Sequence, residues 1–552
     1  MPSKPSRIRT RAGALFIAAT LCLPPLQLAQ AQVRLPALGE SAGEEFSLGT
    51  ERTLGQQIMR EIRRDPAYLD DPLLLDYAQR VWQPLVEAAR QRGEITPDTA
   101  QQLAFEVFLV RDRSVNAFAL PGGYVGVHLG LIAMTASSDE LAAVLAHELS
   151  HVTQRHIARG VVNAQRVTLL SMAGLILGVL AAGRAGSSDG VQAAVVGSQA
   201  AAVQGQLNYT RDMEREADRV GFGVLADAGY APGGMASMFE KLDAANRLND
   251  SGAFPYLRSH PLTVERISEA RARIALGAPK AKSDTVEHAL MAARSRVLMD
   301  AGADGLRRQQ QRAAITLAPG AASVSSAEQL GALYAGALAT LLLGDAAGAD
   351  AAVAKASRLL HDKPSASAER VFRQLQAQIA LQRGDAPAAW KLLDDRSDSR
   401  ATLLLRGQVA LALWQGAGGV AACASGASGA SGASAASGAA LAAPCDAPAV
   451  LRGSGEALRT WVSAHPQDAL AWSLLAQTED ALGQPLRSLR AQAEARVALG
   501  DIGGAIDRLR AAQSLVRAGS ANDFIEGSVV DARLRQLQAQ QREIAAALRG
   551  GR

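Results

Sequence analysis

The chain has 552 residues, enough for about two to four domains, and a formal net charge of +4. Four basic side chains and no acidic one lie in the first 31 residues, so the remaining chain has no net charge and gives no argument for nucleic-acid binding. Hydrophobic residues make up 48% of the chain and aromatic residues only 4%, which favours closely packed helices over thick sheets.

The N-terminal segment, residues 1–31, has the pattern of a secretory signal peptide. Its basic residues are followed by an apolar run over residues 12–23 and by the small residues Ala29 and Ala31, so we expect cleavage after Ala31. An apolar run of about 12 residues is too short to cross the ~30 Å hydrocarbon core of a membrane as a helix. We therefore predict an exported protein.

Residues 32–281 combine helix and strand patterns, and we expect them to form one domain. The first predicted elements are two amphipathic helices and three short strands, over residues 58–64, 72–90, 103–110, 116–120 and 124–129. The last two strands are separated by Pro121, Gly122 and Gly123, which have the composition of a tight turn.

A helix with an apolar face is predicted next, beginning at Ser137 and ending at Gly160. Ser137 followed three residues later by Glu140 fits a capping box, in which each side chain accepts a hydrogen bond from the other residue's backbone N–H. Apolar residues recur along this segment at helical spacing, so one face is expected to lie in the core.

Residues 167–182 are mostly apolar and carry no charge. The segment is short for a membrane-spanning helix, and Gly174 and Gly178 are spaced like a helix-packing face. We expect a buried or hairpin helix beside the helix that begins at Ser137. Peripheral contact with a membrane surface and a true span are the alternatives.

Residues 282–552 are predicted to be all-helical. Gly-Asp pairs at residues 344–345, 384–385 and 500–501 each separate an apolar helical stretch from an Ala-containing one. Helix-turn-helix arrays of the tetratricopeptide type have a period of ~34 residues and this kind of turn, although the aromatic landmarks of that repeat are mostly missing here. We predict a tetratricopeptide-like repeat array, with a plain helical bundle as the alternative.

A low-complexity Ala/Ser/Gly insert near residues 417–447 interrupts the helical region. Such a composition cannot bury a hydrophobic core. Cys423 and Cys445 bracket the repeats of this insert, and in an oxidising compartment we predict that they form a disulfide.

The catalytic chemistry concentrates at His147-Glu148-Leu149-Ser150-His151. Two histidines four residues apart lie on one face of a helix, close enough for both imidazoles to bind one zinc ion. Glu148 follows the first ligand, where a carboxylate can take a proton from the attacking water. His156 would lie on the opposite side of the same helix, so we do not expect it to be a ligand.

A catalytic zinc site needs a third protein ligand, and a second predicted helix carries three acidic candidates. These are Glu214, Glu216 and Asp218. Spacing alone does not decide among them.

The pattern H-E-x-x-H at residues 147–151, followed by E-x-x-A-D at residues 214–218, resembles the HtpX and CAAX-prenyl-protease family of zinc metallopeptidases. NAFALPGG at residues 116–123 and RSHP at residues 258–261 resemble further elements of that family. The resemblance covers roughly residues 39–275 and implies an α+β, zincin-like metalloprotease domain.

The same resemblance assigns the remaining site residues. It implies that Glu214 is the third zinc ligand and that Asp218 supports a ligand imidazole. It also implies that His260 reaches the zinc as an extra ligand and keeps the enzyme latent. The alternative for His260 is a loop histidine that forms local hydrogen bonds before Pro261.

The export signal, protease domain and C-terminal repeats together are most similar to the periplasmic chaperone-proteases of this family. We therefore expect a periplasmic zinc metalloendopeptidase that cleaves misfolded or stalled envelope proteins in outer-membrane protein quality control. The resemblance also suggests the outer-membrane β-barrel assembly machinery as a partner of the repeats. We expect the strand over residues 124–129 to pair with an extended substrate.

Two other functions fit parts of the sequence. The first is a repeat-based periplasmic chaperone or assembly factor whose zinc site is mostly latent. The second is an intramembrane prenyl-type protease, which would need several long apolar spans, and only residues 167–182 approach one.

Overall fold

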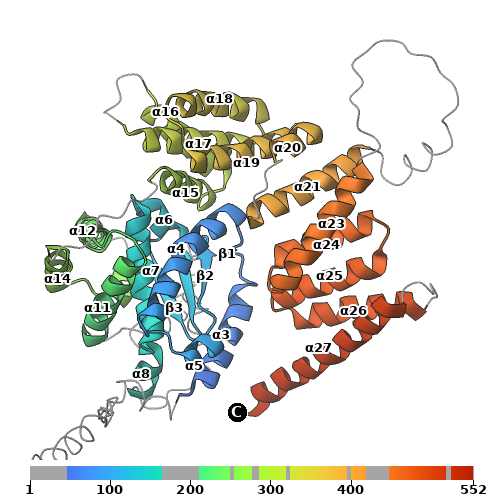
Figure 1. Ribbon diagram of the computed structural model, residues 1–552, viewed down its shortest axis with the longest axis horizontal. Coiled ribbons are helices and arrows are strands. Elements are labelled where there is room, and N and C mark those ends of the chain that lie inside the picture. The colour runs from blue at the N-terminus through green and yellow to red at the C-terminus, as the bar shows by residue number, and fades with distance from the viewer. Residues whose placement is uncertain are drawn as a thin grey trace, which may run out of the picture. The chain divides into compact units, whose positions relative to one another are not determined.

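The computed structural model describes residues 46–163, 211–248, 254–275, 285–318, 324–393, 399–417, 447–517 and 524–550. These residues belong to one compact unit, Ala42–Arg552. Figure 1 shows a small sheet with helices packed around it in the first part of the chain and helices alone in the rest. The predicted signal peptide, the apolar segment 167–182, and Cys423 and Cys445 lie outside the described residues.

Most elements predicted for the first part are confirmed. Its elements are α3 (Leu48–Ile62), β1 (Tyr68–Leu69), α4 (Pro72–Gln91), α5 (Pro97–Gln102), β2 (Glu106–Val110), β3 (Ala117–Leu120), β4 (Tyr124–His128), α6 (Leu129–Met134), α7 (Ser138–Thr153), α8 (His156–Asn163), α11 (Arg211–Asp227), α12 (Gly233–Leu248), α13 (Pro255–Ser259) and α14 (Val264–Ala275). Strand β2 begins later than predicted because Phe105 has a left-handed backbone, with φ of 46°.

The order of the strands places β1 and β3 at the two edges of the sheet. Its strand order is β1-β2-β4-β3, with β2 parallel to β4 and β3 antiparallel to β4. Strand β4 therefore has a neighbour on each side, and the expectation that residues 124–129 pair with a substrate is wrong. Among the described residues, β3 is the edge strand beside the site, and its Ala117 and Ala119 are at most 8% exposed.

The start of α7 differs in detail from the predicted capping box. Ser137 is the N-cap, and its hydroxyl accepts from the Glu140 N–H at 3.3 Å. The Glu140 carboxylate instead accepts from the Ala136 N–H at 2.7 Å and from Lys241 Nζ at 2.6 Å. The same oxygen thereby connects the start of α7 to α12.

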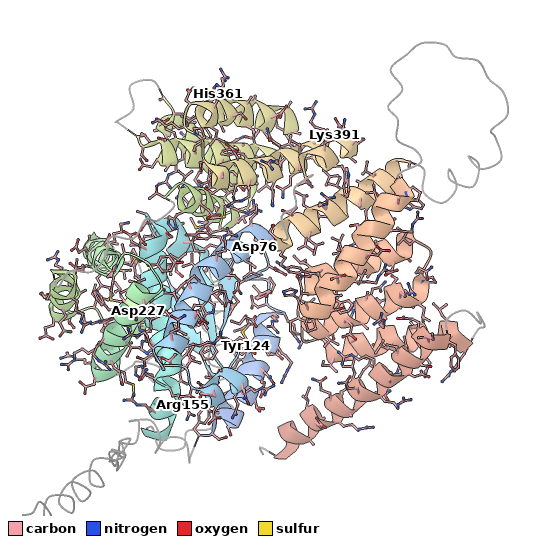
Figure 2. All side chains as sticks on the ribbon, viewed as in Figure 1. Asp76, Tyr124, Arg155, Asp227, His361 and Lys391 are labelled. Atoms are coloured by element: carbon pink, nitrogen blue, oxygen red, sulfur yellow. The ribbon has the colours of Figure 1, made fainter. Side chains whose placement is uncertain are left out.

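The C-terminal end of α7 differs more from the prediction. The helix ends at Thr153 rather than at Gly160, because Arg155 has a left-handed backbone with φ of 52°. The Arg155 guanidinium, labelled in Figure 2, lies 3.3 Å from the buried carboxylate of Glu51, and this contact helps to hold the strained residue. A separate helix, α8, then begins at His156.

After residue 284 every described element is a helix. These helices are α15 (Thr285–Leu298), α16 (Ala303–Thr316), α17 (Ser326–Leu342), α18 (Ala346–Asp362), α19 (Ala366–Gln382), α20 (Ala386–Leu392), α21 (Arg400–Gly416), α23 (Ala447–Ala464), α24 (Ala469–Ala481), α25 (Pro485–Ala498), α26 (Ile502–Arg517) and α27 (Phe524–Gly550). Within the described part of the chain, no helix is both long and apolar enough to cross a membrane.

The three Gly-Asp pairs are turns between consecutive helices. Gly344, Gly384 and Gly500 all have positive φ, between 77° and 92°, which glycine adopts without a steric penalty. The side chains of Asp345 and Asp385 then cap the following helices. The predicted helix-turn-helix units are confirmed at these positions, and their assignment to the tetratricopeptide type remains a prediction.

A buried ion pair joins α15 to the N-terminus of α4. The Arg294 guanidinium donates to both carboxylate oxygens of Asp71, at 2.7 and 2.6 Å, and to the hydroxyl of Tyr334 at 2.8 Å. Asp71 also caps α4 by accepting from the Leu74 N–H. The pair is bidentate and more than nine-tenths buried, so neither partner has water to replace the other.

We expect Arg294→Met to lower the free energy of unfolding by about 3–5 kcal/mol, because it leaves the Asp71 carboxylate buried without its cation. The matched control is Arg308→Ala, which removes an exposed pair with Asp300 and should cost at most about 1 kcal/mol. Thermal and urea unfolding of the full chain measure both. Equal losses of stability in the two variants would show that the buried ion pair contributes no more to the free energy of unfolding than the exposed one.

Candidate metal centre

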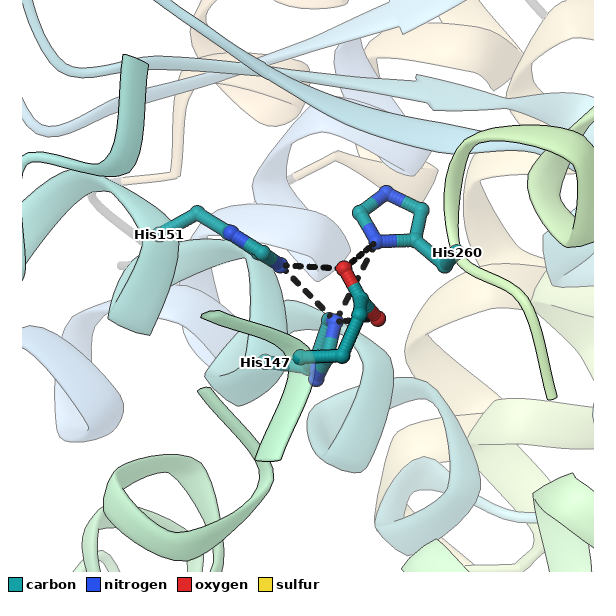
Figure 3. A group of neighbouring side chains, drawn as sticks. His147, His151 and His260 are labelled. Carbon is teal, nitrogen blue, oxygen red and sulfur yellow. Dashed lines mark hydrogen bonds and ion pairs between the residues drawn. The ribbon is translucent and has the colours of Figure 1, made fainter. Parts of the chain in front are cut away.

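Two histidines on consecutive turns of α7 supply ligand atoms to the candidate site. Residues from Ser138 to Val152 of this helix are all buried, and His147 and His151 are at most 1% exposed. Helix α11 contributes Glu214, and His260 follows the short helix α13. One ligand atom from each of these four residues lies within 4.8 Å of the other three. Figure 3 shows the three imidazoles directed toward a common point.

Close packing of two helices brings Glu214 to the histidines. Helix α11 approaches α7 at Gly221, where an added Cβ would lie only 3.1 Å from the carbonyl carbon and oxygen of Ala146 and 3.2 Å from the His147 nitrogen. A side chain at this position would require the facing backbone of α7 to move by a few tenths of an ångström, at the height of the first histidine. The glycine therefore sets the distance across which Glu214 reaches the cluster.

The spacing of the four ligand atoms matches a tetrahedral cation. His147 Nε2 lies 3.0 Å from His151 Nε2 and 3.3 Å from His260 Nδ1. Glu214 Oε1 lies 3.0 Å from His260 Nδ1 and 3.5 Å from His151 Nε2. Zinc with bonds of about 2.0–2.1 Å in tetrahedral geometry separates its ligand atoms by about 3.3 Å.

The donor set also fits zinc chemically. Three imidazole nitrogens and one carboxylate oxygen face one another in a site that is at most 2% exposed. Their lone pairs repel unless a proton or a cation lies between them, and imidazole with carboxylate is a common set of zinc ligands. The residues present therefore fit a zinc ion.

Two further charged side chains hold these ligands from outside. Asp218 Oδ1 lies 2.9 Å from His147 Nδ1, the ring nitrogen directed away from the cluster. Arg266 donates to both oxygens of Asp218, at 2.6 and 2.8 Å, and its guanidinium lies 2.9 Å from Glu214 Oε2. Burial opposes the charged form of Asp218, but the hydrogen bonds from Arg266 and His147 outweigh it and lower its pKa.

Burial and neighbouring charges shift the pKa values of the cluster residues in different directions. Burial opposes ionisation of Glu214, but His260 and His147 beside it hold its pKa far below the usual range. Burial and the neighbouring His147 lower the pKa of His151 well below its ordinary value. The pKa of His147 is raised to about 9, because contacts with Asp218 and Glu214 outweigh its burial. Metal binding at neutral pH must therefore displace a proton from His147.

Glu148 lies next to the four ligand residues but does not contribute a ligand atom. Its Oε2 accepts from the backbone N–H of Ala119 on the edge strand β3, at 3.1 Å. Its Oε1 lies 3.5 Å from His260 Nε2. The buried carboxylate is thus fixed between the edge strand and the cluster, which suits it to receive a proton from water held there.

The structure brings all of the sequence-predicted site residues together. His147, His151, Glu214 and His260 form the cluster, with Glu148 and Asp218 in contact with it. Glu216, which spacing alone left open as a ligand, is directed to a different partner, His156.

Sequence reasoning assigned no role at the site to two neighbours of the cluster, although Arg266 belongs to the stretch after RSHP that resembles the family. Arg266 contacts both Asp218 and Glu214, and a six-residue separation from His260 gives no local signal for this. His156 lies 2.8 Å from His151 Nδ1, although a continuous helix would place it on the far side. Burial lowers the pKa of His156 to about 4, although its contact with Glu216 opposes the shift.

Comparison with known proteins is consistent with this centre. The model of peptidase family M48 matches residues 79–274, which include every residue of the cluster. A putative beta-barrel assembly-enhancing protease of Vibrio cholerae is 35% identical over 320 residues, which are 56% of this chain and 62% of that protein, so the aligned region spans less than two thirds of that relative.

Two other relatives align over nearly the whole chain. The beta-barrel assembly-enhancing protease of Yersinia pestis is 30% identical over 93% of this chain and 93% of its own length. The protein of the same name from Escherichia coli K12 is 29% identical over 91% of this chain and 92% of its own length. The chain therefore belongs to peptidase family M48, a family of zinc-dependent metallopeptidases.

Proposed function

We propose that this metallopeptidase is an exported endopeptidase that cleaves misfolded or stalled envelope proteins in the quality control of outer-membrane proteins. The observation that carries the proposal is the buried cluster of four ligand atoms beside Glu148, whose carboxylate contacts the edge strand β3. The names of the relatives, which refer to β-barrel assembly, support the substrate class. Cleavage of the predicted signal peptide would place the mature chain in the periplasm.

In this proposal His147, His151 and Glu214 hold the zinc ion. Zinc, when bound, polarises the scissile carbonyl and makes water acidic enough to attack near neutral pH. Glu148 accepts the proton of the attacking water and returns it to the leaving amine. Asp218 keeps the Nδ1 proton of His147 on the side away from the metal, with Arg266 holding Asp218 in place.

The edge strand β3 is the proposed recognition element for the substrate backbone. The Asn116 carbonyl accepts from the His128 N–H across the ladder, so hydrogen-bonding groups of Ala117 and Ala119 point away from β4. The Ala119 N–H already contacts Glu148, which places the outer edge of β3 at the proposed base. A substrate added there as a strand is recognised through its backbone, with little dependence on its side chains.

His260 has a regulatory role in this proposal. With His260 as a fourth ligand, the coordination position that a catalytic site leaves for water is filled. Its ring stacks on Tyr256 at a centroid distance of 4.6 Å, and both are at most 2% exposed. His260 would therefore have to leave the cluster before catalysis begins.

The helical region would recruit clients or dock on the β-barrel assembly machinery. Antiparallel helix pairs linked by short Gly-Asp turns support the tetratricopeptide-like assignment. The alternative function, a repeat-based chaperone whose zinc site is mostly latent, is favoured by one observation, the presence of His260 within the ligand cluster.

We expect Glu148→Gln to retain about one zinc ion per chain while losing proteolysis by at least about 100-fold, because an amide cannot accept the proton of water. Zinc content and cleavage of unfolded casein by the mature chain measure these effects. The companion variant His147→Ala should lose both metal and activity. Wild-type cleavage by Glu148→Gln would overturn the assignment of Glu148 as the base.

We expect His260→Ala to retain zinc and to raise casein cleavage several-fold, including self-cleavage, because the position for water becomes available. Cleavage rates must be compared with wild type at matched zinc content. Loss of activity without loss of metal would instead make His260 a participant in catalysis. An unchanged rate would reject both roles and leave His260 as a loop residue.

A further inference from the structure

The two α7 histidines of the cluster are held differently at their outer ring nitrogens. His147 Nδ1 contacts a carboxylate directly, that of Asp218, at 2.9 Å. His151 Nδ1 instead contacts a second imidazole, at 2.8 Å from His156 Nδ1. The other ring nitrogen of His156, Nε2, lies 3.1 Å from a carboxylate oxygen of Glu216.

The chemistry of these partners fixes where the protons lie. A carboxylate can only accept, so Nε2 of His156 carries the proton that faces Glu216. The contact between the two Nδ1 atoms holds one proton, because two lone pairs or two N–H groups would repel at 2.8 Å. His151 must offer Nε2 as a lone pair to bind a metal, so that proton belongs to His151 Nδ1.

Surrounding contacts hold His156 in this position. The side chain is fully buried, at 0% exposure. Arg159 Nη1 donates to the same Glu216 oxygen at 2.8 Å, which keeps that carboxylate ionised and directed at His156. The left-handed backbone of Arg155 ends α7 and begins a new helix at His156, so the imidazole returns toward His151.

We propose that His156, supported by Glu216 and Arg159, is a positioning residue that keeps His151 in the tautomer able to bind zinc. The inference rests on the proposed zinc site, of which His151 is a ligand. A carboxylate behind a metal-bound histidine commonly performs this role directly. In this chain Asp218 does so for His147, whereas Glu216 acts on His151 through an intervening imidazole.

The test measures zinc affinity of the full mature chain by competition with a chelator. We expect His156→Phe to weaken zinc binding by about 10–100-fold, because it removes the imidazole that accepts the Nδ1 proton of His151. We expect His156→Asn to recover most of that loss, because its amide oxygen replaces Nδ1 as the acceptor. Glu216→Gln, at a position 17% exposed, should fold normally and weaken zinc binding to a smaller extent.

The control is Gln154→Ala, which changes the same helix junction but contacts Glu94 rather than the imidazoles, and zinc affinity should stay unchanged. Absorption of the Co²⁺-substituted protein gives a second readout, since His156→Phe should alter the metal geometry and His156→Asn should restore it. Neither measurement depends on catalysis.

The relative zinc affinities of His156→Phe and His156→Asn decide the proposal. A purely structural role predicts that Phe, which fills the volume, is tolerated at least as well as Asn. If His156→Phe binds zinc at least as tightly as His156→Asn, the proposed positioning role of His156 is overturned. Zinc affinities within twofold of wild type for both variants would also overturn it. If His147→Ala still abolishes zinc binding, the proposed zinc site survives this failure. A wild-type chain without zinc would refute the proposed function itself.

Discussion

The placement of protons around three buried imidazoles is the constraint on which this structure depends. Nε2 of His147 and Nε2 of His151 face each other at 3.0 Å, with Nδ1 of His260 close by. A metal can bind there only if each of these nitrogens offers a lone pair, so the ring protons must lie on the opposite nitrogens. Hydrogen-bond acceptors outside the cluster are therefore as necessary as the ligands themselves.

One helix supplies three of the acidic groups around these imidazoles. On α11, Glu214 enters the cluster, Asp218 lies 2.9 Å from His147 Nδ1 and Glu216 contacts His156. Their spacing allows this because successive residues of a helix face different neighbours, so three acids within five positions reach three different imidazoles. Gly221 on the same helix permits the close approach to α7 at Ala146 and the backbone of His147.

Local patterns in the sequence predicted the parts of the site that one element determines. His147, Glu148 and His151 lie on a single helix, so their spacing alone indicated a metal site. Glu214 required family resemblance, since packing between two helices selects it over its acidic neighbours. His156 was placed on the wrong side because a single left-handed residue, Arg155, ends the helix, and tertiary contacts such as that with Glu51 stabilise it. The edge strand was misassigned because strand order depends on pairing between segments, which hydrophobic alternation does not encode.

Release of His260 from the cluster would be coupled to binding of a substrate along β3. The segment that carries His260 also touches the chain just before the edge strand, where the Tyr256 N–H donates to the Val115 carbonyl at 3.4 Å. A substrate strand extended along β3 toward Val115 would meet this segment. Displacement of α13 (Pro255–Ser259) would then open the strand edge and withdraw the fourth ligand in one movement. Arg266 donates to the carbonyl of Pro261, the residue after His260, and also to Asp218, so this movement would take place beside the groups that hold the metal ligands.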